Sequence, residues 1–126
     1  MSCLNFSDAL RDLCFSQRLS VDEAMDTYFA PGYTHRNSGQ AKTRAEFAAM
    51  AARAREQIAS GEIQVLDEFR DGDRYSERHI LDITNEDGGG ERAEINLIGR
   101  YATDGRFLKI NEAGFSREEA QDDAAR

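Results

Sequence analysis

The spacing of hydrophobic residues changes about half-way along the chain. In the first half, apolar residues recur every three or four positions, which is the spacing of one face of a helix. In the second half they alternate with polar residues, as in strands that bury one face. Helices followed by consecutive strands predict an α+β fold, in which three N-terminal helices pack on one face of an antiparallel sheet.

Three helices are predicted in the first half. Ser7 is the expected cap of the first helix. The segments SVDE (20–23) and TRAE (43–46) are capping boxes, in which a Ser or Thr and a later Glu satisfy free backbone N–H groups. The second helix should end at Pro31, which has no backbone N–H, and the third at SG (60–61). The side chains that these helices would bury are Leu10, Leu13, Cys14, Val21, Ala24, Met25, Tyr28, Phe29, Phe47, Met50, Ala51, Ala54 and Ile58.

Four strands are predicted in the second half, with the sequences EIQVLDEF, RYSERHILDIT, ERAEINLIGRYA and FLKINEAGF. The first strand would place Ile63, Val65 and Phe69 on one face. The alternating apolar side chains of the third strand are Ile95, Leu97 and Tyr101. The turns between the strands are DGD (71–73), NEDGGG (85–90) and TDG (103–105).

Composition limits the partners and the location that we expect. The chain has 126 residues, with 16 Lys and Arg against 24 Asp and Glu, a formal charge of −8 that argues against nucleic acid and membrane surfaces as partners. We expect one domain over residues 1–116 and a disordered, charged tail over 117–126. Cys3 and Cys14 show no metal or redox spacing, and no apolar run is long enough for a membrane span or a secretion signal. A cytoplasmic protein with reduced thiols is therefore predicted.

The order of these segments is similar to a known superfamily. A helix, YFAPGYTHRNSG, a helix from TRAEFAAM, then DGDRYSERHIL and GRYATDGRFLKINE, together resemble the nuclear transport factor 2-like (NTF2-like) superfamily over residues 6–115. Within it, the chain resembles the SnoaL-like small-molecule group, which includes polyketide cyclases and Δ5-3-ketosteroid isomerase. The resemblance implies a strongly curved sheet wrapped around the helices as a cone, a pocket inside the cone, and a homodimer formed through the sheet.

Glu112 is the first candidate for chemistry. By alternation it shares a strand face with Leu108, Ile110 and Gly114, so an acid continues an apolar row. The resemblance implies that this face of the last strand lines the cavity. A partly desolvated carboxyl group has a raised pKa, which suits a general acid or base near neutral pH. The alternative is an acid that pairs with a basic neighbour or tilts into solvent.

Arg78 is predicted as the partner of Glu112. The resemblance implies that Arg78 points into the cone with the row of Ser76, Ile80 and Asp82, where it would orient Glu112 or bind a polar group of a ligand. The alternative is a structural ion pair with Glu112 or Glu94. The opposite row, Tyr75, Glu77, His79 and Leu81, is no more apolar, so alternation alone does not orient this strand. His79 would then face away from the cavity, in a structural or dimer-facing role.

The loop YTHRNSG contributes His35 as a third catalytic candidate, because histidine titrates near pH 7 without help. Its alternative is a partly exposed loop histidine. Asn37 stands near the place where isomerases of this group carry an aspartate, and an amide cannot act as a base, so it is left with hydrogen bonding to a ligand. The other predicted pocket residues, for which core packing is the alternative, are Tyr28, Tyr33, Phe47, Met50, Ile80, Leu97, Tyr101 and Ile110.

These residues support two main functional hypotheses. The first is a cofactor-independent isomerase, cyclase or hydratase that acts on a small, apolar, oxygenated molecule, with Glu112, Arg78 and His35 as catalytic groups. The second is a non-catalytic module that binds a ligand or dimerises. An adaptor for proteins of nuclear transport is a weaker third reading. No glycine-rich phosphate loop and no metal-ligand spacing is present, and an outward-facing Ile98 suggests a homodimer.

Overall fold

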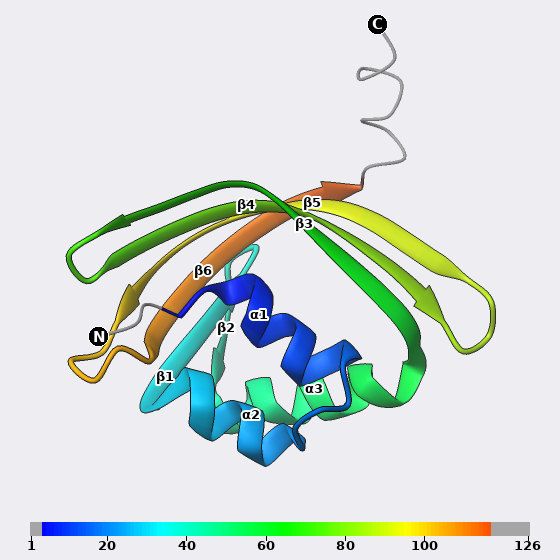
Figure 1. Ribbon diagram of the computed structural model, residues 1–126, viewed down its shortest axis with the longest axis horizontal. Helices are drawn as coiled ribbons and strands as arrows, with labels where there is room; N and C mark the ends of the chain where they lie inside the picture. The colour runs from blue at the N-terminus through cyan, green and yellow to red at the C-terminus, as the bar shows by residue number, and fades with distance from the viewer. Residues whose placement is uncertain (1–3, 117–126) are drawn as a thin grey trace, which may run out of the picture.

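The computed structural model describes residues 4–116 and shows an arched sheet that covers a layer of helices on its concave side (Figure 1). The predicted α+β class, with three helices on one face of the sheet, is confirmed. Cys3 and the predicted disordered tail at 117–126 lie outside the described residues. The elements in chain order are α1 (Phe6–Leu10), the π-helical turn η1 (Arg11–Phe15) that continues α1, α2 (Val21–Tyr28), β1 (Phe29–Asn37), β2 (Gln40–Thr43), α3 (Arg44–Gln57), β3 (Ile58–Asp71), β4 (Arg74–Asn85), β5 (Gly90–Tyr101) and β6 (Phe107–Ser116).

The six strands form one mixed sheet in the order β2-β1-β6-β5-β4-β3. The predicted antiparallel meander is found from β3 to β6. It is extended by β1, which pairs with β6 in parallel and carries β2 on its other edge. Pro31 lies where the β1–β6 register shifts between Phe29 and Thr34, a place that tolerates a residue without a backbone N–H. The parallel pairing brings His35, which was expected in a loop but lies in β1, next to the last strand.

The helix boundaries follow the caps closely. Both predicted capping boxes are present, with Ser20 and Thr43 as N-caps. The cap of α1 is Asn5 rather than Ser7, because the Asn5 carboxamide oxygen accepts the backbone N–H of Asp8 at 2.8 Å. Phe29 and Ile58, both expected in helices, are instead the first residues of β1 and β3.

Gly61 does not end a helix as predicted but lies inside β3. A β-carbon at this position would lie 2.5 Å from the ring of Phe15. The glycine therefore lets η1 pack directly on the strand, which explains why a helix-breaking residue is found within an extended segment.

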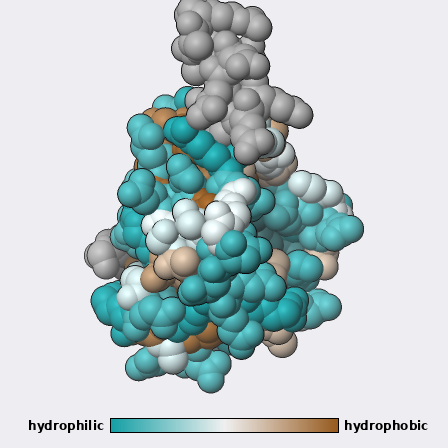
Figure 2. Space-filling model, turned by 90° about the vertical axis from the view of Figure 1, so that its right-hand side faces the viewer, coloured by the Kyte–Doolittle hydropathy of each residue, from teal (hydrophilic) through white to brown (hydrophobic). Residues whose placement is uncertain are grey.

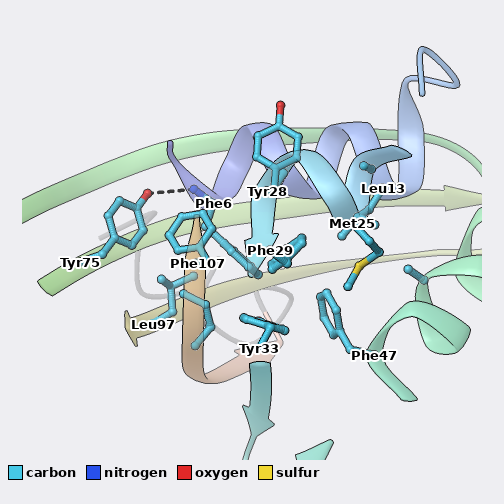
Figure 3. Packing of buried hydrophobic residues seen from close by; sticks show 14 of the residues in the cluster. Phe6, Leu13, Met25, Tyr28, Phe29, Tyr33, Phe47, Tyr75, Leu97 and Phe107 are labelled. Carbon is cyan, nitrogen blue, oxygen red and sulfur yellow. Dashed lines mark hydrogen bonds between the residues drawn. The ribbon is translucent and has the colours of Figure 1, made fainter. Parts of the chain in front are cut away.

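The core is an aromatic cluster between the helices and the concave face of the sheet (Figure 3). Phe29 lies at its centre, with its ring centroid 4.5 Å from that of Tyr33 and 5.3 Å from that of Phe47. Each fully buried side chain of this size contributes ~1.5–3 kcal/mol to folding. The other large members of the cluster are Phe6, Leu13, Met25, Tyr28, Tyr75, Leu97, Tyr101, Phe107 and Ile110.

The outside of the molecule is mostly polar. The side shown in Figure 2 is largely hydrophilic, with apolar residues in small separate areas. Ile98 and Phe69 on the convex face of the sheet are nevertheless 61% and 68% exposed. Among residues 4–116, no helix has the length and apolar character needed to cross a bilayer.

Candidate active site on the concave face

The parallel pairing of β1 and β6 brings three polar side chains into one hydrogen-bonded chain. The hydroxyl group of Tyr33 lies 2.7 Å from Nδ1 of His35, and Nε2 of His35 lies 3.1 Å from Oε1 of Glu112. In the sheet register His35 is opposite Ile110 and Asn37 is opposite Glu112, so His35 and Glu112 are diagonal neighbours on one face. We call Tyr33, His35 and Glu112 the relay.

The protons of the relay have one consistent arrangement. Burial, and then the nearby charge of Glu112, raises the pKa of Tyr33, so the phenol keeps its proton. In the tautomer with the imidazole proton on Nε2, Tyr33 donates its O–H to Nδ1 of His35, and Nε2–H donates to Oε1 of Glu112. Glu112 is then the acceptor at the end of the chain.

The two ends of the relay differ in their access to solvent. The side chain of His35 is 1% exposed and is stacked on Phe47, with ring centroids 4.3 Å apart. The side chain of Glu112 is 13% exposed, and its Oε2 has no hydrogen-bond partner among the described residues. Glu112 Oε2 is thus the one carboxylate oxygen of the relay that is free to meet a ligand.

A hollow of about 270 Å³ lies farther along the same strands, and although no relay residue lines it, it is bordered by close neighbours of Glu112. Its wall includes Asn37, the register partner of Glu112, together with Ile95 and Gly114. Gly114 is needed there because a β-carbon would lie 2.5 Å from Cδ1 of Ile95. Asn37 is therefore an exposed residue at the edge of this hollow.

Comparison with known proteins places this geometry on a familiar scaffold. No family model and no curated protein matches the sequence. Among solved structures, a candidate isomerase from Rhodopseudomonas palustris superposes with a TM-score of 0.74 at 11% identity, over 96% of this chain and 94% of that one. An NTF2-like protein from Exiguobacterium has a TM-score of 0.65 at 17% identity, over 86% and 95% of the two chains. A candidate SnoaL-like polyketide cyclase from Jannaschia has a TM-score of 0.61 at 18% identity, over 80% and 74%.

The chain has the NTF2-like fold. The superposition confirms the resemblance that the order of segments indicated. At these identities the comparison establishes the scaffold, and the NTF2-like fold carries many different chemistries. The function must therefore be argued from the side chains of this chain.

The NTF2-like sheet carries a second buried acid and histidine, on β4. Oε2 of Glu77 lies 2.6 Å from Nδ1 of His79, and the side chains of both residues are 0% exposed. The hydroxyl group of Tyr75 contacts Oε1 of Glu77 at 2.7 Å and Oε2 of Glu68 at 2.6 Å, and it accepts the backbone N–H of Phe6 at 3.0 Å. We call Glu68, Tyr75, Glu77 and His79 the β4 cluster. It fixes the start of α1 to the sheet.

The predicted inward direction of Arg78 is wrong. In the register, Glu77 is paired with Leu97 and Leu97 with Glu112, so the odd-numbered residues of β4 share the concave face with Glu112. Arg78 points to the convex face, where it forms ion pairs with Asp67 at 2.8 Å and Glu94 at 3.2 Å. Its predicted role beside Glu112 is therefore excluded, and its alternative, an ion pair that includes Glu94, is what the structure shows.

The same alternation along β4 shows that two neighbours of Arg78 also point in the direction opposite to the one predicted. Ile80, predicted to line the pocket, lies on the convex face and borders a groove with Asp82 and Arg92. His79, predicted to face outward, is fully buried in the β4 cluster.

The remaining predicted pocket residues are divided between the relay and the core. Phe47 packs on His35, and Leu97 and Ile110 lie on the concave face with it. Met50 is half-buried against the core. The hydroxyl of Tyr28 donates to Asp12, away from the cluster (Figure 3), and that of Tyr101 donates to the backbone oxygen of Leu4 at 2.6 Å. Tyr28 and Tyr101 are therefore core residues.

The β4 cluster was missed because the sequence does not fix the register of β4 against β5. The structure pairs Thr84 with Gly90 and therefore places Leu97 opposite Glu77. The predicted loop, residues 85–90, would instead pair Thr84 with Glu91 and place Leu97 opposite Arg78. This difference of one residue reverses the face on which each side chain of β4 lies.

The Cys14 thiol and the possible metal ligands in the described part of the chain give no sign of a further reactive site. Burial raises the pKa of the Cys14 thiol to about 11, so Cys14 is a core side chain and not a nucleophile. Within residues 4–116, no group of three or more His, Cys, Asp or Glu side chains is arranged to hold a metal ion.

Proposed function

We propose that this protein is a small-molecule-binding protein that uses Glu112 as a general base or acid, with no cofactor, in an isomerase, cyclase or hydratase reaction. The main support for the proposal is that the relay leaves one carboxylate oxygen, Oε2 of Glu112, free. Glu112 Oε2 is accessible, while Oε1 is held by His35, which Tyr33 holds in turn. A fixed carboxylate beside a partly apolar hollow suits removal of a proton from carbon next to a carbonyl group.

Each member of the relay has a separate role in this proposal. Glu112 takes the proton from the substrate and returns it at another atom. His35 holds the carboxylate in one orientation through its Nε2–H, and Tyr33 fixes the tautomer that makes this possible. Asn37 donates a hydrogen bond from its amide to an oxygen atom of the substrate.

The size of the hollow supports a small substrate. Its volume, about 270 Å³, is at the lower end of the range for ligand sites, about 300–1,000 Å³. Asn37 stands where an acid would be expected for a ketosteroid isomerase, and the hollow is narrow for a steroid. We therefore propose a substrate of one or two rings that carries a ketone.

The alternative is a ligand-binding module without chemistry. One observation favours it, namely that aromatic side chains fill the space between α3 and the sheet, as Phe29, Tyr33 and Phe47 show. In that case a ligand binds beside Asn37 and Glu112 but leaves unchanged.

The test is exchange of carbon-bound hydrogen for deuterium in D₂O, followed by proton NMR. Cyclohexanone and 2-cyclohexenone are suitable probes because, without a catalyst, their α-hydrogens exchange slowly enough at neutral pH to be followed. The wild-type protein should accelerate the exchange of at least one probe. Glu112→Gln should lower that acceleration by ~10²–10⁴-fold, which is the usual contribution of a general acid or base.

The matched control is Glu56→Gln, which makes the same change at an exposed site on α3. It should leave the rate unchanged. Equal rates for wild type and Glu112→Gln would refute the role of Glu112. Binding of a probe with no exchange in the wild-type protein would support the alternative.

A further inference from the structure

A large hollow lies on the convex face of the sheet, opposite the relay. It has a volume of about 760 Å³. The side chains that form it come from four adjacent strands, β1, β6, β5 and β4, and a residue of β2 closes one end. The residues of this groove whose side chains point outward are Thr34, Arg36, Ala41, Arg74, Ile98, Arg100, Lys109 and Asn111.

The groove is basic, although the protein as a whole carries a formal charge of −8. Arg74, Arg100 and Lys109 are register partners on three adjacent strands. Neighbouring strands lie ~4.8 Å apart, so these three cations stand in a row about 10 Å long. Arg36 belongs to the next row, where it is opposite Asn111. No acidic residue is among those that line the groove.

These cations are poorly compensated within the described chain. Arg100 has one ion pair, with Asp73 at 3.5 Å. The side chains of Arg36, Arg74 and Lys109 form no ion pair or hydrogen bond with a residue of the described range 4–116. Arg78, four residues beyond Arg74 on β4, shows the contrast, since it is paired with both Asp67 and Glu94.

Like charges that face one another across strands destabilise a sheet, and an anion bound between them removes that cost. The chain has ample acid to pair with these positions, since it contains 24 Asp and Glu. None of the acidic residues in the described range 4–116 lines the groove, so a bound anion would supply the charge that these cations lack.

We propose that this groove binds a small organic anion with two or more phosphate or carboxylate groups. The guanidinium groups of Arg74 and Arg100 offer paired N–H donors that match such groups, and Lys109 adds a third cation in the same row. Ile98, which is 61% exposed, gives the groove an apolar floor for the carbon part of the ligand. The volume is that of a small-molecule site.

The groove is a different site from the relay, although His35 and Ile110, whose side chains are buried on the concave face, also border it. Alternation along β1 and β6 turns His35 and Ile110 inward, while their neighbours Arg36 and Lys109 point outward. The anion would bind on the other side of the same two strands. This proposal is therefore independent of the role of Glu112 in catalysis.

The experiment is isothermal titration calorimetry with two probes, inorganic tripolyphosphate and citrate, at low and at high salt. The wild-type protein should bind at least one of them, more weakly at high salt. Arg74→Gln and Lys109→Gln should each weaken binding at least tenfold. The control is Arg53→Gln, at an exposed arginine on α3 that lies outside the groove, which should change binding less than twofold. The two probes distinguish a phosphate ligand from a carboxylate ligand.

Three results would overturn the proposal. The first is the absence of binding by both probes at low salt. The second is an equal loss in Arg53→Gln, which would mean a general effect of charge. The third is that Arg74→Gln and Lys109→Gln turn a dimer into a monomer by light scattering without any effect on anion binding. The convex face would then be covered by a second copy of the chain. All three substitutions are at exposed positions, and unchanged thermal unfolding would show that the variants are folded.

Discussion

The relay and the β4 cluster are two buried acid and histidine pairs on the same face of one sheet, and they differ in whether one end is open. In the relay, the side chain of Glu112 is 13% exposed and one of its oxygens is free. In the β4 cluster, Glu77 and His79 are 0% exposed, and Glu77 accepts from Tyr75, from His79 and from the backbone N–H of Ser7.

The comparison shows that similar residues can have different roles in the same protein. A carboxylate whose oxygens are both occupied by the protein cannot reach a substrate, and its hydrogen bonds stabilise the fold instead. A carboxylate held by one oxygen keeps the other for chemistry. The β4 cluster should therefore control stability, and the relay should control activity. The predictions below test this division, beginning with the largest effect.

Removal of the buried acid should be the most damaging change. Glu77→Ala leaves His79 buried without its partner, which costs about 3–5 kcal/mol of the free energy of unfolding. The corresponding change at the exposed end of the relay, Glu112→Ala, should cost about 1 kcal/mol, because solvent can reach the groups that are left. Urea denaturation followed by circular dichroism measures both values. Equal costs would contradict the division between the two pairs.

Removal of a single hydroxyl should show the same difference on a smaller scale. Tyr75→Phe deletes an oxygen that contacts Phe6, Glu68 and Glu77, and should lower the free energy of unfolding by ~2–3 kcal/mol. Tyr33→Phe deletes one hydrogen bond, to His35, and should cost ~1 kcal/mol. A larger loss of stability for Tyr33→Phe than for Tyr75→Phe would argue against our assignment of the β4 cluster as the structural one.

Acid should weaken the β4 cluster. Burial alone would raise the pKa of Glu77, but hydrogen bonds from His79 and Tyr75 outweigh it, and the pKa lies below its ordinary value of 4.5. The folded protein thus holds this proton less tightly than the unfolded chain. The stability that Glu77 contributes is complete above pH 4.5 and is lost as the pH falls below 4.5 through the pKa of the folded state.

The check is the urea midpoint of wild type and Glu77→Gln between pH 7 and pH 3. The midpoint of the wild type should fall below pH 4.5, and that of the variant should fall less steeply because one of the responsible groups is absent. Asp12, whose pKa is also lowered, by hydrogen bonds from Arg18 and Tyr28 that outweigh its burial, contributes to both curves. Parallel curves would mean that Glu77 has no part in the acid sensitivity.

Much of the fold could be predicted because its signals are local. The capping boxes at Ser20 and Thr43 satisfy backbone groups within four residues, and they begin helices whatever the rest of the chain does. The turns at Gly72, Gly88 and Gly105 have positive φ angles, which glycine adopts readily. Glu112 and His35 could be chosen as candidates, because an acid in an apolar row and a histidine near a strand are visible in the sequence.

The orientation of strands could not be predicted from alternation alone. Ile63 is 9% exposed and Phe69 is 68% exposed, although they were expected on the same face. The register of β3 shifts between Val65 and Asp67, and this bulge reverses the direction of every side chain beyond it. The error at Arg78 has a similar origin, since only the pairing with β5 decides which row of β4 faces inward.

The most direct test of the central claim compares Glu112→Gln with Glu77→Gln in the deuterium-exchange assay, at a temperature where both variants are folded. The account predicts that Glu112→Gln loses the accelerated exchange of the ketone and that Glu77→Gln keeps most of it, despite its lower stability. The claim is contradicted if Glu112→Gln exchanges the ketone as fast as the wild type, or if Glu77→Gln alone abolishes exchange while folded.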